Sequence, residues 1–197
     1  MGRSRKLKVN YRTTEQIRRF ASALLEGLEI DDLDGEEDPR PGYRSLTHGV
    51  VPEVCDFADV TEEAAFIAKR IEQLCADETD YSGCCVVLRR NALRDEFAEQ
   101  LSSLGLPVVV LERQADNQQV VGVRLASMHR VKGLEFRHVF LAGMKEGELP
   151  NPSAMSSDDP VEVKAADLAE RALVHVAASR AIEHLHLTFT GEKSRYL

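Results

Sequence analysis

Apolar residues recur along this chain in two alternating patterns, one with the period of an α-helix and the other a short continuous run. The helical spacing predicts amphipathic helices, and the bounded runs predict buried strands. Their alternation predicts right-handed βαβ units, and therefore an α/β fold with a mostly parallel sheet and helices on both faces. By these patterns we expect helices at residues 13–28, 61–74, 91–104 and 168–176, and strands at 54–58, 84–88, 108–111, 121–126, 139–142 and 185–189.

Two of the predicted helices carry start signals. Thr13 and Gln16 have the spacing of a capping box, which predicts a helix of about four turns that runs to Leu28. Thr61 is followed by two glutamates, and carboxylates in a first turn suit the helix dipole. We therefore expect Thr61 to cap the second helix.

Two polar segments interrupt the alternation. Residues 26–45 begin with an acidic stretch that contains no basic residue up to position 38 and continue with a Pro/Gly cluster, which predicts an excursion on the surface. Residues 143–160 are rich in Ser, Pro and Asp and predict a loop. The acidic stretch is too short for a domain linker, so we expect residues 1–197 to form a single domain.

Composition narrows the class of protein. The chain has 197 residues, of which 43% are apolar and 29% charged, as in ordinary globular domains. Its formal net charge of −8 repels nucleic acid on average, so binding to DNA requires a local basic strip. No apolar run is long enough to span a bilayer, and the N-terminus lacks the apolar region of a secretory signal. We expect a cytoplasmic protein with no membrane partner.

The cysteines and histidines predict no metal site. The four cysteines include no C-x-x-C pair, and Cys84 and Cys85 lie inside an apolar run, which predicts two small core residues. His184 and His186 share one face of a predicted strand, and we expect no third ligand to join them. We interpret these histidines as polar positions of a strand.

Three polar patches carry candidate chemistry, and each has a plain structural alternative. Arg12 precedes a predicted helix N-terminus, where a guanidinium suits phosphate oxygens, and Tyr11 is able to stack on a base. Alternatively, the tyrosine packs in the core and the arginine covers it. Arg180 follows a helix of small residues that can hold it towards a phosphate on a neighbouring domain, or it is an ordinary arginine near a helix C-terminus.

The remaining patch lies between two predicted strands. Ser127, His129, Arg130 and Lys132 form a polar, mostly basic segment that can contact the phosphates of a nucleic-acid backbone. Ligands of open α/β sheets bind at such crossings, beyond the carboxyl ends of the strands. The alternative is a solvated turn with scattered charges.

The order and spacing of these patches resemble motifs IV, V and VI of the UvrD/Rep/PcrA family of superfamily 1 DNA helicases. The resemblance extends from about Leu7 to Phe189, and Lys-Gly-Leu-Glu-Phe is its most specific part. It is carried by Asn-Tyr-Arg-Thr at 10–13, Ser-Met-His-Arg-Val-Lys-Gly-Leu-Glu-Phe at 127–136, Glu-Arg at 170–171 and Val-Ala-Ala-Ser-Arg-Ala at 176–181. Val-Val-Leu-Arg-Arg at 86–90 is similar to an intermediate strand of the same family.

The resemblance implies a RecA-like domain, the second of two that bind ATP between them while single-stranded DNA crosses their tops. By it, Arg12 and Arg180 contact the γ-phosphate as catalytic arginines, and the DNA backbone is contacted by Ser127, His129 and Lys132, with Arg130 as an added phosphate contact. It also places Tyr11 against the adenine ring and Glu135 on the ribose, with Gly133 allowing the backbone to approach the nucleotide.

The phosphate-binding loop of such motors is missing from this sequence. None of the twelve glycines is followed by Lys, so there is no G-x-x-x-x-G-K-[ST] motif. We therefore expect that the chain alone hydrolyses no ATP, and that an N-terminal P-loop domain of the same parent protein holds the Mg²⁺. By analogy with the family, the parent is a DNA repair or replication helicase.

Two alternatives stay open at this point. One is a non-enzymatic, helicase-like module that binds protein or nucleic acid, with the acidic residues 26–38 as its recruiting element. The other is a fusion of helicase and nuclease whose nuclease lies outside this chain. A P-loop in the parent sequence favours the motor, and its absence favours the binding module.

Overall fold

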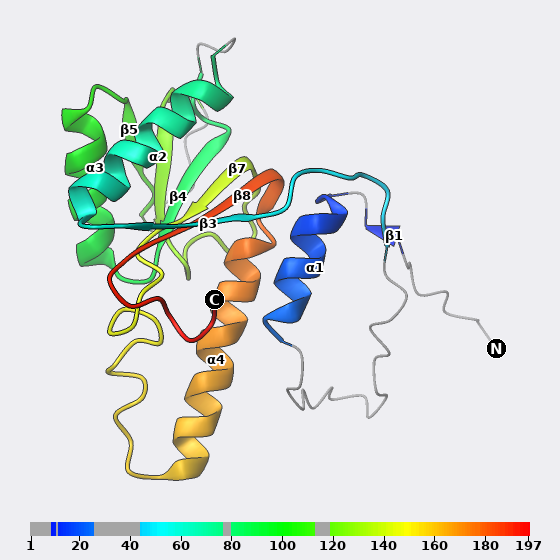
Figure 1. The fold of residues 1–197 in the computed structure, drawn as a ribbon, viewed down its shortest axis with the longest axis vertical. Helices are drawn as coiled ribbons and strands as arrows, with labels where there is room; N and C mark the ends of the chain where they lie inside the picture. Colours follow the sequence, from blue (N-terminus) through cyan, green and yellow to red (C-terminus); the bar gives the residue numbers. More distant parts are fainter. Residues whose placement is uncertain (1–8, 11, 26–43, 77–79, 113–118) are drawn as a thin grey trace.

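The architecture is that of a parallel sheet between two layers of helices (Figure 1). The computed structural model describes residues 9–10, 12–25, 44–76, 80–112 and 119–197. The six strands of the main sheet are all parallel and lie in the order β3-β8-β7-β4-β6-β5. Their bounds are β3 (Glu53–Phe57), β4 (Cys84–Leu88), β5 (Val108–Val110), β6 (Val123–Ser127), β7 (Phe136–Leu141) and β8 (Ala181–Thr190). The predicted α/β class and parallel sheet are confirmed.

In the part of the chain that the structure describes, two helices pack on each face of the sheet. α2 (Val60–Leu74) and α3 (Asn91–Ser103) cover one face, and α1 (Glu15–Ala23) and α4 (Pro160–Ala178) lie on the other (Figure 1). The central strand β4 is fully buried, with Cys84 in the α2/α3 core and Cys85 in the α1/α4 core. Alternate side chains of a strand point to opposite faces, so both cysteines are the core residues that the pattern predicted.

The helix boundaries differ from the predicted ones because the capping side chains differ. Thr14, not Thr13, caps α1 and accepts the Ile17 N–H at 3.5 Å, while the Thr13 carbonyl accepts the Ser45 hydroxyl of β2 (Arg44–Ser45). α1 ends at Ala23, so the prediction of four turns was wrong. α4 begins at Pro160, well before the predicted start, because Asp159 caps it and accepts the Val161 N–H at 2.8 Å.

Asp59 caps α2, and a pair of variants tests this assignment. Its carboxylate accepts the Glu62 N–H at 2.9 Å, whereas Thr61 was the predicted cap. Asp59→Ala is expected to lower the free energy of unfolding by about 1 kcal/mol, because it removes that acceptor. Thr61→Ala is the matched control and should change it by less than about 0.5 kcal/mol. Denaturant unfolding followed by circular dichroism measures both; equal losses contradict the assignment.

Polar residues at the start of β7 and of β8 interrupt the apolar pattern, so the sequence analysis placed the starts of both strands too late. β7 begins at Phe136 rather than at 139, and β8 begins at Ala181 rather than at 185. These polar residues include His138 and His184, which are directly opposite each other in the sheet. A short parallel pair, β1 (Val9–Asn10) with β2, was not predicted.

The structure describes the second of the two predicted polar segments but little of the first. Most of the acidic stretch, residues 26–43, lies outside the described residues. Residues 143–159 connect β7 to α4 and contain neither helix nor strand of the main sheet. Within the described part of the chain, no helix combines the length and apolar character needed to cross a membrane.

Candidate functional site

Three segments far apart in the sequence meet at the amino ends of β7 and β8. Arg12 lies just before α1, Glu135 directly before β7, and Arg180 between α4 and β8. Backbone hydrogen bonds join the segments: the Phe136 N–H donates to the Arg180 carbonyl at 3.0 Å, and the Thr14 N–H donates to the Ile182 carbonyl at 3.3 Å. The sheet therefore holds the three candidate nucleotide residues in one place.

The charges of this group are complementary but unequal. Arg12 Nε lies 2.6 Å from Glu135 Oε1, and 58% of the Arg12 side chain is exposed. Burial first, and then the charge of Arg12, lower the pKa of the Arg180 guanidinium, while Glu135 acts in the opposite direction. Because an arginine stays protonated in proteins, two positive charges face one carboxylate within the described part of the chain. Taken together, these three side chains carry a net positive charge, which suits an anion.

The polypeptide fixes the Arg180 side chain in one orientation. Its Nε donates to the Val176 carbonyl at 3.0 Å, its Nη1 to the Leu134 carbonyl at 3.4 Å, and its Nη2 to Ser179 Oγ at 3.0 Å. Little rotamer entropy remains to be lost when this guanidinium meets a ligand.

Gly133 has a φ of +86°, a conformation that a residue with a Cβ rarely adopts.

The candidate nucleic-acid residues lie on the segment that leaves the carboxyl end of β6. Ser127 ends that strand, and its carbonyl accepts the Arg130 N–H at 2.9 Å in a turn. His129 and Lys132 are exposed, whereas Arg130 is half-buried and donates from Nε to the Glu112 carbonyl. Apolar side chains anchor the turn, since Met128 and Val131 are buried in the α1/α4 core.

The sequence pattern treated residues 127–136 as one patch, but the structure divides it. Ser127 lies at the carboxyl end of β6, while Glu135 precedes the amino end of β7, and the strands are parallel. The expectation that the whole patch gathers beyond the carboxyl ends was therefore wrong for Glu135. Two separate groups result: an arginine–carboxylate group at one edge of the sheet and a polar turn that starts at the other. Tyr11 lies outside the described residues.

A buried ion pair between β4 and α4 was missed by sequence reasoning. Glu170 is 3% exposed and accepts from Arg89 Nε at 2.8 Å and Nη2 at 2.5 Å, and from the Asn151 N–H at 3.0 Å. Burial alone raises the pKa of Glu170, but the hydrogen bonds from Arg89 and Asn151 outweigh it and leave the pKa below its usual value. The one available signal was the arginine directly after a buried strand.

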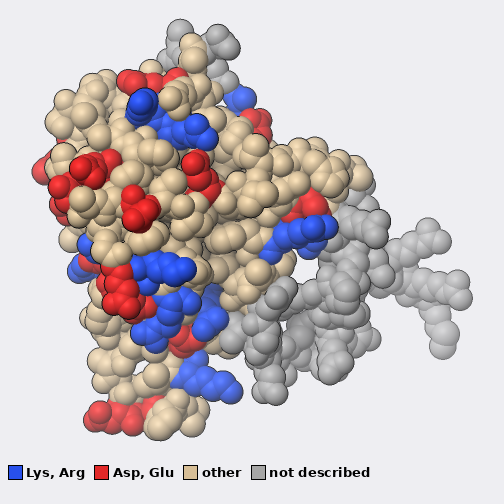
Figure 2. Space-filling view, in the orientation of Figure 1, with Lys and Arg blue, Asp and Glu red and all other residues tan. Residues whose placement is uncertain are grey.

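Neighbouring charges neutralise much of the basic surface near α4. Lys and Arg side chains gather beside α4 and the C-terminal segment, with Asp and Glu among them (Figure 2). Arg171 lies 2.8 Å from Asp167 and its guanidinium covers the Tyr196 ring at 5.0 Å, so it does not join Arg180. Arg195 pairs with Glu146 at 3.3 Å. Pairing of this kind leaves less positive potential for phosphates than a count of arginines suggests.

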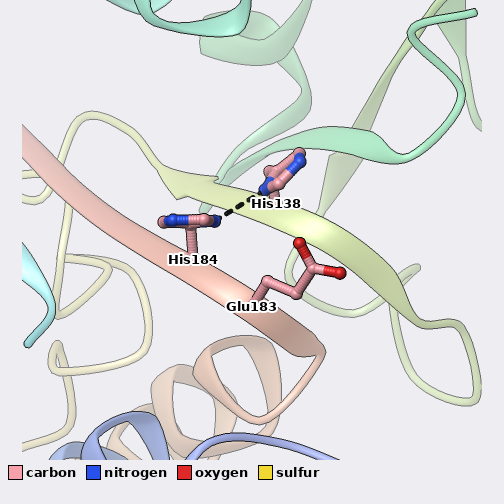
Figure 3. Close-up of side chains that lie close together, drawn as sticks. All are labelled: His138, Glu183 and His184. Atoms are coloured by element: carbon pink, nitrogen blue, oxygen red, sulfur yellow. Dashed lines mark hydrogen bonds between the residues drawn. The ribbon is translucent and has the colours of Figure 1, made fainter. Parts of the chain in front are cut away.

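The histidines do have further ligand groups nearby, contrary to the sequence expectation. His138 and Glu183 place their ligand atoms within 4.8 Å of that of His184 (Figure 3). His138 is 46 positions away in the chain and meets His184 only because β7 and β8 are neighbours. No local spacing rule reveals such a pair.

Comparison with known proteins finds a matching family and relatives that are named as DNA helicases. The family of UvrD-like helicase C-terminal domains matches residues 5–116 and 112–192. The chain is 29% identical over 199 residues to the ATP-dependent DNA helicase Rep of Salmonella typhimurium strain LT2, covering 100% of this chain and 27% of that protein. It is 29% identical over 164 residues to the ATP-dependent DNA helicase PcrA of Staphylococcus aureus, covering 83% of this chain and 19% of that protein.

A solved structure shares the fold. It is the C-terminal domain of a "possible DNA helicase" from Lactobacillus plantarum WCFS1, with a TM-score of 0.67 and 19% sequence identity over 95% of this chain and 91% of that one. The present chain spans about a quarter of the length of the curated helicases it matches. The similarity therefore concerns one domain of those longer proteins.

Proposed function

This chain belongs to the family of UvrD-like helicase C-terminal domains, and from that premise we propose that it is the second motor domain of an ATP-dependent DNA helicase or translocase. In this role it supplies arginines to ATP that is bound on an N-terminal P-loop domain of the same parent protein. The relatives Rep and PcrA are named as ATP-dependent DNA helicases, which supports this assignment.

The observation that carries the proposal is the convergence of Arg12 and Arg180 beside Glu135. Arginine forks suit the oxygens of a phosphate, and among the described residues these two guanidiniums lie beside one carboxylate. The donor set fits a nucleotide phosphate and not a magnesium ion, which prefers oxygen ligands. We assign the Mg²⁺ to the P-loop domain, where it would neutralise charge on the phosphates.

The residues of the group have separable tasks. Arg180 is held by backbone carbonyls in a fixed position and stabilises negative charge on the γ-phosphate. Arg12 is more exposed and exchanges its partner Glu135 for a phosphate oxygen, which frees that carboxylate for the ribose hydroxyls. Tyr11 is proposed to stack on the adenine.

Single-stranded DNA is proposed to bind along the turn after β6. His129 and Lys132 present exposed polar groups there, with Ser127 and Arg130 beside them. The segment between β6 and β7 holds this turn, and its Leu134 carbonyl accepts a hydrogen bond from Arg180. Movement of this domain towards the nucleotide therefore also displaces the DNA-binding turn.

The test is the steady-state ATPase rate of the full-length protein, with and without single-stranded DNA. We expect DNA-stimulated hydrolysis by the full-length protein and none by the 197-residue chain, which has no P-loop. Lys132→Ala should raise the DNA concentration that gives half-maximal stimulation. It should also reduce the log–log salt dependence of binding by about 0.7, the value for one lost phosphate contact on a single strand.

Lys69→Ala is the matched control for Lys132→Ala, because Lys69 is an exposed lysine of α2 on the other face of the sheet. It should leave both the DNA requirement and the salt dependence unchanged. A full-length protein without DNA-stimulated ATPase activity would favour the non-enzymatic module. Equal effects of the two lysine variants would remove the turn after β6 from the DNA path.

A further inference from the structure

An irregularity in the sheet gathers three metal-binding side chains at the amino ends of β7 and β8. Phe136 pairs with Ala181 and His138 pairs with His184, so two steps along β7 match three along β8. The extra residue on β8 is a β-bulge, a feature that redirects side chains at functional sites. Glu183 and His184 would otherwise point to opposite faces. In Figure 3 one carboxylate oxygen of Glu183 is directed to the space beside His138 and His184.

The distances in this cluster are those of potential ligands. His138 Nδ1 and His184 Nδ1 lie 3.0 Å apart, and the ligand atoms of both histidines and of Glu183 all lie within 4.8 Å of one another. Two imidazole nitrogens that share one proton form a hydrogen bond. If both rings carry their proton on Nε2 instead, both imidazoles stay neutral. Both Nδ1 atoms then become acceptors and can bind one cation.

We propose that His138, His184 and Glu183 form a binding site for a zinc-type divalent cation that joins β7 to β8. Two imidazoles and one carboxylate are a ligand set of zinc sites that keep a fourth position for water. Magnesium and calcium prefer oxygen ligands, so they are poor occupants here.

The surroundings of the cluster support a site of this kind. His138 is buried, while His184 and Glu183 are partly exposed, which leaves a path for a hydrated ion. Arg137 orients the Glu183 carboxylate, since its Nε donates to Oε1 at 3.1 Å and its Nη2 to Oε2 at 3.4 Å, and a carboxylate ligand is commonly oriented by such a partner. His186 stacks on His184 with a 6.4 Å distance between ring centroids and packs on Phe140, which restricts the His184 ring.

The site is distinct from the proposed nucleotide group, although it lies on the same strands. Glu135 and Arg180 precede β7 and β8, whereas the cluster lies within the first four residues of those strands. A cation bound here would hold β7 and β8 together near the ends that Glu135 and Arg180 precede. Cation binding is measured without nucleotide, so it can fail while the helicase proposal stands, and the reverse also holds.

The experiment is titration of the metal-free 197-residue chain with Zn²⁺, followed by calorimetry and by the ¹⁵N resonances of the imidazoles. We expect one Zn²⁺ per chain, with shifts of the Nδ1 resonances of His138 and His184. Glu183→Gln and His184→Ala should each weaken binding at least about tenfold, the scale on which even supporting groups affect metal affinity. Mg²⁺ at the same concentration should cause neither heat nor shifts.

Two controls identify other sources of binding. His48→Ala removes an exposed histidine and should bind Zn²⁺ as the unchanged chain does. With Co²⁺ as the probe, a thiolate-to-metal charge-transfer band would reveal binding at a cysteine such as the partly exposed Cys55 and would overturn the proposal. Unchanged Zn²⁺ affinity in the Glu183→Gln/His184→Ala double variant would overturn it as well, provided that circular dichroism shows a folded chain.

Discussion

Replacement of Arg180 by alanine in the full-length protein is expected to lower kcat for ATP hydrolysis by about 10³–10⁵-fold, the effect of losing an arginine finger. This corresponds to about 4–7 kcal/mol of transition-state stabilisation. The KM for ATP should change far less, because the guanidinium acts on charge that develops at the γ-phosphate. The structural reason is the fixed position of Arg180, whose donors are held by Val176, Leu134 and Ser179.

Steady-state kinetics with saturating single-stranded DNA measures this effect. Arg19→Ala is the matched control: Arg19 is an exposed arginine of α1 that pairs with Glu15, and its loss should leave kcat within about twofold, as for exposed ion pairs worth less than 1 kcal/mol. Arg180→Lys should stay close to Arg180→Ala, since an ammonium cannot reproduce the planar fork. Near-normal turnover of folded Arg180→Ala would falsify the assignment of Arg180.

The largest effect on stability is expected for Glu170→Ala. Breaking a buried pair by removing one partner typically costs about 3–5 kcal/mol, because the other charge stays buried. Here Arg89 is 11% exposed and would lose its carboxylate, and the Asn151 N–H would lose its acceptor. Chemical denaturation at neutral pH measures the loss. Glu146→Ala, which breaks a more exposed pair with Arg195, is the control and should cost about 0–1 kcal/mol.

The stabilisation by Glu170 should also depend on pH in a defined direction. Its pKa in the folded chain lies below its usual value, so the unfolded chain binds the proton more tightly. The contribution is therefore complete above the unfolded pKa, about 4.3 for a glutamate, and is lost as the pH falls through the lower folded value. The difference in unfolding free energy between the unchanged chain and Glu170→Ala should shrink in acid. A difference that is constant from pH 7 to about pH 3 would contradict the role of the ion pair.

Most of the fold could be predicted from local patterns in the sequence. All six strands of the main sheet and the four helices of the described residues lie where the apolar periodicity indicated, with shifted ends. The ends moved because a cap depends on which side chain reaches a free N–H: Thr14 rather than Thr13, and Asp59 rather than Thr61. Polar residues within β7 and β8 interrupted the apolar pattern at His138 and His184.

The candidate site was predicted only in part. Motif order singled out Arg12, Glu135 and Arg180, and the structure places these three together. The partner of Glu170 and the imidazole of His138 beside His184 were not found, because Arg89 and His138 carry no spacing signal towards those residues. Both are contacts between elements that are neighbours only in the folded sheet.

The sequence by itself determined the alternation of helices and strands, the doubly buried β4 and the identity of the residues able to meet a phosphate, since each is encoded by periodicity or by residue chemistry within a short segment. The tertiary structure alone decided which of these residues meet. The strand order sets β7 beside β8 and β4, and that order brings Arg180 to Glu135, Arg89 to Glu170 and His138 to His184. Such contacts depend on how the chain crosses the sheet, and chain crossings leave no trace in the local pattern of apolar and polar residues.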